Sequence, residues 1–523
     1  MYATPAQVEA YVKENPPKPY ISCEYMHAMG NSLGGMKKYT DLERYPAYQG
    51  GFIWDYIDQS LVKIDCDGKE IHGYGGDFTD RPTDYQFCGN GIVYCDRTVS
   101  PKAQEAKFLY QDLKLSADER KVGIRNESRF ADTSAYSFCY LILKEGQPVF
   151  QAEFDAQVPA MEEREFSLEE LGIKAVAEGS GEYTFRLLAL LKEDTLWAKA
   201  GHEVAFGEET KVLKGGFSAS GEDASFGEAD VSPASSLTVV HGDVNIGIHG
   251  EGFSVLFSRA EGGMVSLRYG DKEWATRPPM PVYWRATTDN DRGNHFSVSS
   301  HMWLGAGLFC GFKGAKVQLS ESPDKVTVSY IYHLTVTPET ETRVTYTVTA
   351  NGQIEVEAHY FGKKGLPQLP AFGMRFRLPG RMEGFSWYGY GPEECYVDRM
   401  EGARLGVYTS TPEKNVSPYL MPQECGNRTG CRWLKVDDGE GNRLVFTAGN
   451  PSAFQAGVLP YTAEELEMAY HWDELPSPQY TNVCIYSAMR GVGGDDSWGA
   501  PVYPEYCISG EEDQVLRFTV KRG

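Results

Sequence analysis

Residues 20–32 of the chain read YISCEYMHAMGNS. The stretch begins with a short apolar run, residues 20–23, which is followed directly by the carboxylate of Glu24. A compact apolar run of this kind is typical of a strand buried on both faces. Glu24 then lies at the carboxyl end of that strand, where (β/α) barrels gather their catalytic groups, and His27 and Asn31 follow in the same loop. A glutamate in this position is more often solvated or capping a helix than catalytic, so residue types alone leave its role open.

The sequence around this stretch predicts alternating helices and strands. Residues 4–7 (TPAQ) combine a capping residue, a proline and a glutamine in the spacing that begins a helix, and residues 15–17 (NPP) should end it. A helical pattern over residues 33–45 precedes a second apolar run, residues 51–54. The order helix, strand, helix, strand indicates part of a parallel α/β unit. Trp54, which ends the second run, is either a flat face for a sugar ring or ordinary core packing.

Two β-rich zones follow. Residues 115–214 alternate apolar and polar side chains, as at Phe138, Tyr140 and Ile142, and their length suits an immunoglobulin-like sandwich of antiparallel strands. Residues 215–236 are rich in Gly, Ser, Ala, Asp and Glu, which predicts a linker. Residues 237–523 contain many short strand patterns and few helix signals, so one large β-sandwich is the simplest fold for them.

The composition disfavours nucleic acid and membranes as partners. The 523 residues include 50 Lys and Arg against 73 Asp and Glu, a formal net charge of −23, and such a surface repels phosphate backbones and anionic lipid. Aromatic residues make up 13% of the chain, and aromatic rings fill β-rich cores or stack on sugars. A neutral ligand such as a carbohydrate therefore fits better than a polyanion.

The cysteines and the hydropathy pattern indicate a cytoplasmic location for the chain as written. Eleven cysteines, an odd number without any CxxC pair, are scattered through apolar contexts, which is typical of free thiols in a reducing compartment rather than of a zinc site. No apolar run reaches the roughly 18–20 residues of a membrane span, and residues 1–19 lack the pattern of a signal peptide. A periplasmic location would require a leader upstream of Met1.

Residues 21–32, together with residues 49–59 (QGGFIWDYIDQ), resemble the nucleophile segment and the next strand of bacterial β-galactosidases in glycoside hydrolase family 2. The resemblance continues across the chain, at residues 74–78, 86–91, 284–291, 389–394, 418–424 and 493–498. It implies a mainly β, multidomain protein. The expected domains are the C-terminal part of a (β/α)8 barrel over residues 1–114, an immunoglobulin-like sandwich over 115–214, a linker over 215–236, and a large, galactose-mutarotase-like supersandwich over 237–523.

The resemblance also implies a role for individual residues in releasing terminal β-D-galactose from β-galactosides such as lactose. Glu24 matches the nucleophile, which attacks the anomeric carbon in a retaining double displacement. Tyr2 matches the tyrosine whose hydroxyl bonds to that carboxylate, and His27 matches a contact to a sugar hydroxyl. Trp54 matches the floor of the galactose pocket, and Trp498 matches a platform for the aglycone. The expected carbohydrate ligand is therefore a β-galactoside.

Two metal ions are implied in the same way. Phe87, through its backbone carbonyl, and Asn90 match ligands of a sodium ion that positions a galactose hydroxyl, and hard oxygen donors suit such an ion. Taken as residue types alone, Phe87 is equally well a core residue and Asn90 a turn residue. The family's Mg²⁺ ligands match nothing in this chain, because they belong to a region that precedes its first residues.

The chain departs from the family in its length. The likeness begins near the end of the sixth barrel strand, whereas a complete barrel needs about 250 residues, and the absent part carries the family's general acid/base glutamate. Retaining hydrolysis needs two carboxyl groups about 5–5.5 Å apart, and only the nucleophile is expected here. Asp55, Asp58 and Asp77 are the nearest other carboxylates in sequence and are predicted to shape the pocket or to be structural. We expect negligible activity from the chain alone, and an exposed sheet edge that pairs with the absent part or with a second copy.

Two alternatives stay open at this point. A non-enzymatic carbohydrate-binding protein would expose Trp387, Trp472 and Trp498 in one groove. A family-2 exo-hydrolase of another sugar, a glucuronide or a mannoside, would keep Glu24, although residues 493–498 (GGDDSW) favour the β-galactosidase branch. Replacing Glu24 by glutamine in a complete enzyme separates an enzyme from a binding protein, because it removes turnover and keeps sugar binding.

Overall fold

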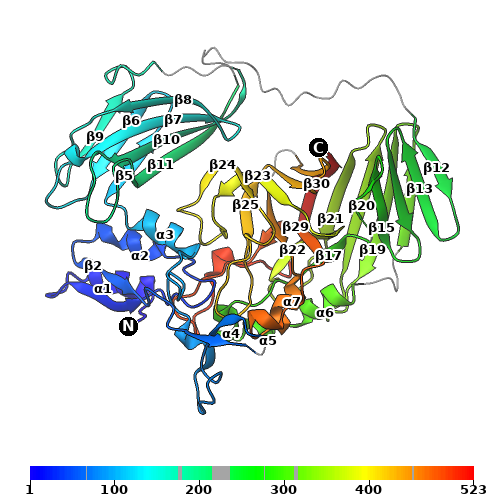
Figure 1. Cartoon of the computed structure of the whole chain (residues 1–523), viewed down its shortest axis with the longest axis horizontal. Coiled ribbons are helices and arrows are strands. Elements are labelled where there is room, and N and C mark those ends of the chain that lie inside the picture. Colours follow the sequence, from blue (N-terminus) through cyan, green and yellow to red (C-terminus); the bar gives the residue numbers. More distant parts are fainter. Residues whose placement is uncertain (66, 175–178, 215–235, 276, 311–315, 450–452) are drawn as a thin grey trace.

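The chain is described by a computed structural model that covers residues 1–65, 67–174, 179–214, 236–275, 277–310, 316–449 and 453–523. Three parts follow one another along the chain (Figure 1): an N-terminal segment of residues 1–112, a middle sandwich of residues 113–213, and a C-terminal sandwich of residues 237–523. The expected mainly β, multidomain fold is confirmed. The predicted linker, residues 215–236, lies outside the described residues except for Ser236.

The N-terminal segment alternates helices and strands as predicted. Helix α1 (Pro5–Lys13) begins after Thr4, whose Oγ1 accepts a hydrogen bond from the Gln7 N–H at 3.3 Å, while Gln7 Oε1 accepts one from the Thr4 N–H at 2.9 Å. Strands β1 (Tyr20–Tyr25) and β2 (Tyr48–Ile53) pair in parallel. The other elements are the helices α2 (Lys37–Thr40), η1 (Asp41–Arg44), η2 (Tyr85–Cys88) and α3 (Lys102–Leu109), and the strands β3 (Leu61–Ile64) and β4 (Glu70–Gly73).

The reciprocal cap of α1 supports a first prediction. Thr4→Ala should lower the free energy of unfolding by about 1 kcal/mol, because the Gln7 N–H in the first turn loses its acceptor. Thr4→Ser keeps an acceptor and serves as the matched control. Amide hydrogen exchange over residues 6–13 measures the effect, and equal protection in Thr4→Ala and the wild type would show that the cap contributes nothing.

Two expectations about this segment are wrong. The helix expected over residues 33–45 begins only with α2, because Gly34 and Gly35 form a turn packed against the C-terminal sandwich, where Gly35 has a φ of +78°. The strands are not buried on both faces, since Ile21 is 55% exposed and Phe52 is 64% exposed. Within the described residues β1 and β2 pair with no third strand, so both are sheet edges and their outward side chains face solvent.

The middle sandwich packs two antiparallel sheets, with strand orders β11-β10-β7-β8 and β5-β6-β9. The alternation predicted for this zone is confirmed, because Phe138, Tyr140 and Ile142 of one strand and Tyr183 and Phe185 of another share the buried core between the sheets. The elements are β5 (Leu113–Ala117), β6 (Lys121–Asn126), η3 (Thr133–Ala135), β7 (Tyr136–Lys144), β8 (Gln147–Phe154), β9 (Glu163–Ser167), β10 (Gly181–Leu191) and β11 (Glu203–Leu213).

The C-terminal sandwich combines three sheets around one core. Their strand orders are β12-β13-β14-β15-β16, β17-β22-β29-β28-β25 and β18-β19-β20-β21-β30-β27-β26-β23-β24. Phe257, Phe376 and Phe446, one from each sheet, belong to a single buried hydrophobic cluster, so the three sheets form one folded unit.

In chain order, the first strands of this unit are β12 (Thr238–His241), β13 (Asn245–Gly250), β14 (Phe253–Ser258), β15 (Gly263–Tyr269), β16 (Lys272–Glu273), β17 (Met280–Val282), β18 (Lys316–Glu321), β19 (Lys325–His333), β20 (Glu341–Thr349) and β21 (Ile354–Tyr360). The later strands are β22 (Ala371–Pro379), β23 (Gly384–Gly391), β24 (Arg404–Ser410), β25 (Asn427–Cys431), β26 (Trp433–Asp437), β27 (Arg443–Ala448), β28 (Phe454–Leu459), β29 (Tyr480–Met489) and β30 (Gln514–Arg522).

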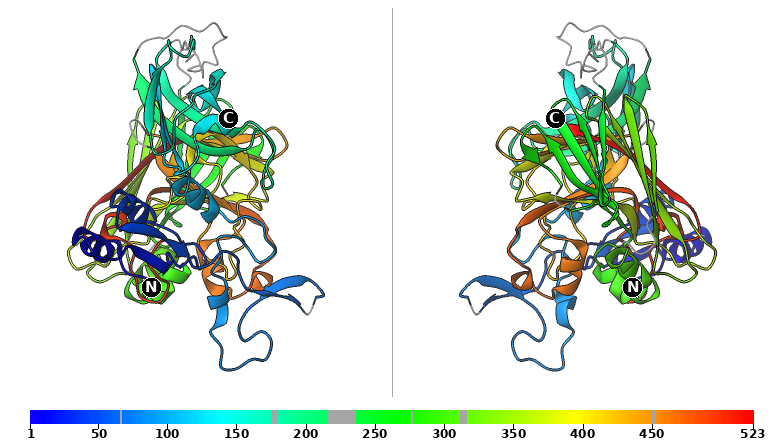
Figure 2. Two further views of the ribbon diagram at one scale, coloured as in Figure 1. Left: turned by 90° about the vertical axis from the view of Figure 1, so that its left-hand side faces the viewer. Right: turned by 90° about the vertical axis from the view of Figure 1, so that its right-hand side faces the viewer.

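Short helices interrupt the C-terminal sandwich. They are α4 (Asp289–Gly293), α5 (Phe296–Ser299), α6 (Met302–Leu308), α7 (Ala463–Met468), η4 (Trp472–Glu474) and η5 (Pro504–Tyr506). Figure 1 shows α4 beside the N-terminal segment and α6 beside β17. The β3–β4 hairpin projects away from the body of the molecule (Figure 2). No helix in the described ranges is long and apolar enough to cross a membrane, and the ten cysteines in those ranges are free thiols.

Candidate active site

The loops that follow β1 and β2 lie side by side and carry the first candidate residues. Glu24 is the penultimate residue of β1 and is half-buried, whereas Trp54 directly follows β2 and is 39% exposed. The Trp54 N–H donates to the Tyr25 carbonyl at 3.3 Å, and the Ala28 N–H donates to the Trp54 carbonyl at 2.7 Å. These bonds fix residues 24–32, the Glu24 loop, against the end of β2. Trp54 is therefore not a core residue, and its ring is open to a ligand.

Tyr2 lies beside Glu24. The Tyr2 N–H donates to the Glu24 carbonyl at 3.2 Å. The Tyr2 hydroxyl is buried and has no hydrogen-bond partner among the described residues. Burial, and after it the charge of the neighbouring Glu24 carboxylate, raises the pKa of Tyr2 well above its ordinary value. The hydroxyl is thus protonated at neutral pH and can donate to a carboxylate or a ligand oxygen.

Four rings from distant parts of the chain gather at this point. The ring centroids of Tyr2 and Trp498 are 4.8 Å apart, and those of His27 and Trp498 are 5.3 Å apart, both in edge-to-face contact. Phe87 lies 5.8 Å from His27 and 6.4 Å from Trp498. Trp498 remains 49% exposed, so the cluster presents an open aromatic face rather than a closed core.

A chain of hydrogen bonds fixes the protonation of His27. Ser497 Oγ donates to Asn290 Oδ1 at 2.7 Å, and the Asn290 amide is itself oriented by donating to the Val492 carbonyl at 3.2 Å. Because the Ser497 proton is used in this way, the His27 Nδ1 that lies 2.8 Å from Ser497 Oγ must be the donor. His27 Nε2 is then an acceptor. Burial, and secondarily the charge of Lys102, lowers the pKa of His27 to about 4, so the ring is neutral at pH 7.

His27 should make the fold sensitive to acid. Its pKa is about 4 in the folded protein against an ordinary value of 6.5, so between these values the unfolded chain binds a proton that the folded chain does not. Stability is therefore lost as the pH falls from 6.5 to 4, by about 3 kcal/mol on account of this residue. Urea unfolding of His27→Gln across this range should show a shallower loss than the wild type. His249→Gln, at an exposed histidine, is the control and should keep the wild-type slope.

Phe87 and Asn90 form a small set of neutral oxygens next to the rings. Asn90 is 5% exposed, its Nδ2 donates to the Phe87 carbonyl at 2.9 Å, and its own carbonyl accepts from the Asp55 N–H at 2.6 Å. Asn90 Oδ1 is buried without a hydrogen-bond partner. A buried, unpaired amide oxygen beside a backbone carbonyl fits a monovalent cation with hard oxygen ligands. The described residues contain no cluster of three or more His, Cys, Asp or Glu side chains arranged to hold a metal ion.

The other nearby carboxylates have structural partners. Asp58 is buried and accepts from the Gly91 N–H at 2.7 Å. Asp77 lies 3.0 Å from His471 Nε2. Asp55 accepts from Gln59 Nε2 at 2.8 Å. Asp55 and Asp58 are therefore engaged within the N-terminal segment, and Asp77 joins that segment to the C-terminal sandwich.

Three residues that support the site were not singled out from the sequence. Ser497 and Asn290 orient His27, and Arg399 holds the Glu24 loop through Asn31. Ser497 and Asn290 lie inside two of the stretches that resemble the family, residues 493–498 and 284–291, but their partners are hundreds of residues away in sequence. The sequence showed that these two stretches contain polar residues, but it did not show which residues those side chains contact.

The groove expected of a non-enzymatic carbohydrate-binding protein is absent from the described residues. Trp387 is 1% exposed and belongs to the core of the C-terminal sandwich. Trp472 is half-buried and donates through its ring N–H to the Tyr419 carbonyl at 2.7 Å. Of the three tryptophans expected in that groove, Trp498 alone is strongly exposed, so the expectation of one exposed groove is wrong.

Three family profiles match the chain. Residues 1–115 match the TIM barrel domain of glycosyl hydrolases family 2, residues 122–210 match domain 4 of β-galactosidase, and residues 249–520 match the β-galactosidase small chain. Together the matches define the class of the protein: the chain belongs to family 2 of the glycosyl hydrolases.

Curated relatives define the branch. The β-galactosidase of Halalkalibacterium halodurans is 49% identical over 529 residues, covering 100% of this chain and 50% of that protein, and that of Streptococcus thermophilus is 41% identical over 545 residues, covering 100% and 51%. The β-galactosidase small subunit of Latilactobacillus sakei is 40% identical over 313 residues, covering 54% and 97%. The chain belongs to the β-galactosidase family, and it spans about half the length of the first two relatives.

Proposed function

We propose that this chain supplies the nucleophile side of a retaining exo-glycosidase site that releases terminal non-reducing β-D-galactose from β-galactosides such as lactose. The observation that carries the proposal is the convergence of Tyr2, His27, Phe87 and Trp498 at the end of β1, where Glu24 lies. A carboxylate at the end of a barrel strand, flanked by exposed rings, suits attack on a sugar that stacks on those rings.

In this proposal each side chain has one task. The Glu24 carboxylate attacks the anomeric carbon and forms a glycosyl ester, while the Tyr2 hydroxyl donates to that carboxylate and orients it. His27 Nε2, fixed as an acceptor, receives a hydrogen bond from a sugar hydroxyl. Trp54 and Trp498 supply flat faces for the galactose ring and the aglycone. Protonation of the leaving oxygen requires a second carboxyl group about 5–5.5 Å from the first, which the proposal assigns to a part of the enzyme outside this chain.

The proposal includes a sodium ion. The Phe87 carbonyl and Asn90 Oδ1 would hold it, and the unpaired, buried Asn90 oxygen supports this assignment. When bound, the ion would orient a sugar hydroxyl by accepting one of its lone pairs. The Mg²⁺ ion implied by the family resemblance is assigned to residues outside the chain.

The exposed face of the N-terminal segment supports a polypeptide partner. Phe52 is the penultimate residue of β2 and is 64% exposed, and Tyr56, which follows that strand, is 66% exposed. Leu61, Val62 and Ile64 of β3 are each more than half exposed. Apolar side chains on an open sheet edge favour pairing with another chain. We propose that the N-terminal half of the enzyme, or a second copy of this chain, covers them. We also propose a cytoplasmic location, which the free thiols of the described residues support.

A complementation assay tests the function. The chain is assayed on nitrophenyl β-D-galactoside alone and after mixing with the N-terminal half of the Halalkalibacterium halodurans β-galactosidase. We expect turnover from the mixture and none from either part. Turnover by the chain alone would overturn the incomplete site. A mixture that forms a stable complex but turns over only the glucuronide or the mannoside would overturn the choice of sugar.

A further inference from the structure

Two adjacent buried residues of the C-terminal sandwich contact both loops of the candidate site. Asp398 and Arg399 lie between β23 and β24 and are 7% and 2% exposed. One loop they contact is the Glu24 loop, residues 24–32. The other is residues 491–498, the Trp498 loop, which also carries Ser497. A single dipeptide is thus shared by two segments that are more than 450 residues apart in sequence.

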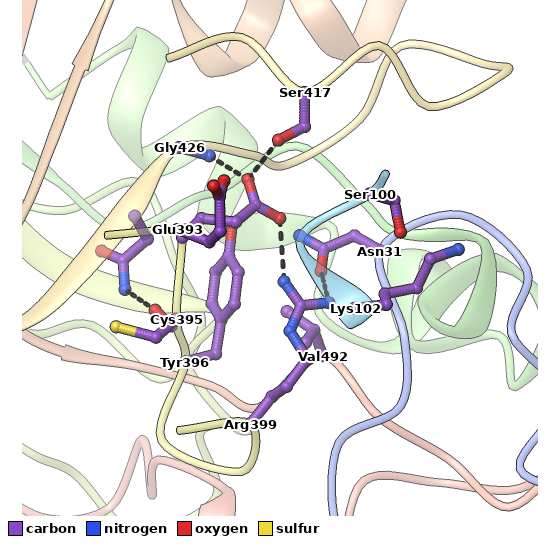
Figure 3. Close-up of polar contacts among 12 residues, drawn as sticks. Asn31, Ser100, Lys102, Glu393, Cys395, Tyr396, Arg399, Ser417, Gly426 and Val492 are labelled. Atoms are coloured by element: carbon purple, nitrogen blue, oxygen red, sulfur yellow. Dashed lines mark hydrogen bonds and ion pairs between the residues drawn. The ribbon is translucent and has the colours of Figure 1, made fainter. Parts of the chain in front are cut away.

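Arg399 holds the Glu24 loop. Its Nη1 donates to Asn31 Oδ1 and to the Ser32 carbonyl, each at 2.8 Å, and its Nη2 donates to Glu394 Oε1 at 2.8 Å. Figure 3 shows the guanidinium between Asn31 and a carboxylate that also accepts from Ser417. Because the C-terminal sandwich fixes that carboxylate, the Arg399 guanidinium bound to it is also fixed, and it holds the Glu24 loop in one position.

Glu394 is fixed by several donors of the C-terminal sandwich. Ser417 Oγ donates to its Oε2 at 2.8 Å, the Gly426 N–H donates to the same oxygen, and the Tyr419 hydroxyl donates to Oε1. Glu394 and Arg399 are therefore a buried ion pair, in which both carboxylate oxygens and both terminal guanidinium nitrogens have partners, so neither group is free to follow a moving loop.

Asp398 holds the Trp498 loop from the other side. Its Oδ1 accepts from the Val492 N–H at 3.1 Å and its Oδ2 accepts from the Gly493 N–H at 2.8 Å. Its backbone carbonyl accepts from the Gly35 N–H at 2.7 Å, just beyond the Glu24 loop. Asp398 therefore bridges both sides of the site with one side chain and one carbonyl.

Glycines allow this close approach. A Cβ at Gly34 would lie 1.9 Å from Asp398 Oδ2, and a Cβ at Gly493 would lie 2.3 Å from the Gly34 carbonyl oxygen. Any side chain at either position would push the two backbones apart. The spacing between the loops is thus set at backbone distance, with the Asp398 carboxylate between them.

We propose that Asp398 and Arg399 are positioning residues that set the separation between the Glu24 loop and the Trp498 loop. Calling these loops the two sides of a sugar site rests on the proposed function, but the mechanical coupling does not. In this view the C-terminal sandwich takes part in the site in two ways: it presents Trp498 and Ser497, and it fixes the loop that carries Glu24 and His27 relative to them.

The coupling is measured on the whole chain by ¹⁹F NMR after labelling its nine tryptophans with 5-fluorotryptophan. Trp498→Phe assigns the Trp498 resonance. Asp398→Asn replaces one acceptor oxygen by a donor that faces a backbone N–H, so we expect the Trp498 resonance to move by more than its linewidth. The ¹⁵N resonance of His27 Nδ1 should also move, because its Ser497 partner belongs to the displaced loop. The resonances of the buried Trp303 should stay in place and report an intact fold.

Two further variants keep the test decisive. Gly493→Ala forces the loops apart without changing any charge and should move the same two resonances, so it replaces Asp398→Asn if that variant fails to fold. Glu182→Gln, which breaks an ion pair with Arg432 between the middle and C-terminal sandwiches, is the matched control and should leave both resonances unchanged. Unmoved Trp498 and His27 signals in a folded Gly493→Ala protein would overturn the proposal. Neither readout needs turnover, so a failed complementation assay would count against the function and not against the coupling.

Discussion

Glu24→Gln should abolish galactoside turnover in the complex of this chain with the N-terminal half of a relative. We expect kcat to fall by a factor of roughly 10⁴ or more, the scale on which removal of a nucleophile acts. A neutral amide has the shape of the carboxylate but cannot form the glycosyl ester. Sugar binding should persist, because Tyr2, His27 and Trp498 keep their contacts with one another. The two quantities are kcat on nitrophenyl β-D-galactoside and the Kd of a non-hydrolysable thiogalactoside.

Asp55→Asn is the matched control for this experiment. Asp55 is also a carboxylate at the end of a parallel strand, but its oxygens accept from the Tyr56 N–H and from Gln59 Nε2. An asparagine keeps part of that arrangement, so kcat should stay within about tenfold of the wild type. If Glu24→Gln retains wild-type turnover, Glu24 is not the nucleophile. If it loses thiogalactoside binding as well as turnover, the residue acts in binding and the assignment of a covalent role is wrong.

Local signals in the sequence predicted local structure well. The Thr4 and Gln7 spacing identified the start of α1, and the period-two pattern at Phe138, Tyr140 and Ile142 identified a strand with a buried face. These features depend on residues within a few positions of one another. The prediction that β1 is buried on both faces is wrong. An apolar residue such as Ile21 indicates that burial would be favourable, but it does not indicate whether a neighbouring strand is present to bury it.

The site could be predicted only in part, for a physical reason. His27 and Trp498 are in contact across 470 residues of sequence, and no periodicity or spacing encodes that contact; the family resemblance brought them together. The resemblance named residues that face a sugar. It gave no role to Arg399, Asp398 or Asn290, whose task is to hold those residues, because a buried polar side chain is recognised by its partners and those are known only from the fold.

Glu105→Gln should raise the stability of the chain at neutral and alkaline pH. Glu105 lies on α3 and is 2% exposed; its Oε2 accepts from the Gly402 N–H at 3.0 Å and its Oε1 has no partner among the described residues. Burial, opposed in part by the Gly402 hydrogen bond, raises its pKa to about 8. The folded protein thus holds a proton that the unfolded chain releases near pH 4.5. The stabilisation from that proton is complete below pH 4.5 and is lost as the pH rises to 8, a change of about 5 kcal/mol.

Glutamine keeps the acceptor for the Gly402 N–H and has no proton to lose, so Glu105→Gln should exceed the wild type by about 3 kcal/mol at pH 7 and match it at pH 4.5. Urea unfolding from pH 4.5 to 8.5 measures the difference, and Glu169→Gln, at an exposed glutamate, should show none. Parallel curves for Glu105→Gln and the wild type would mean that Glu105 is charged in the fold.

The protonation of Glu105 bears on the candidate site, because Lys102 on the same helix donates to the Ala28 carbonyl of the Glu24 loop. A charge that appears on Glu105 above pH 8 is buried one helical turn from that contact, so loosening of α3 should reach the loop that carries Glu24 before the sandwich cores unfold.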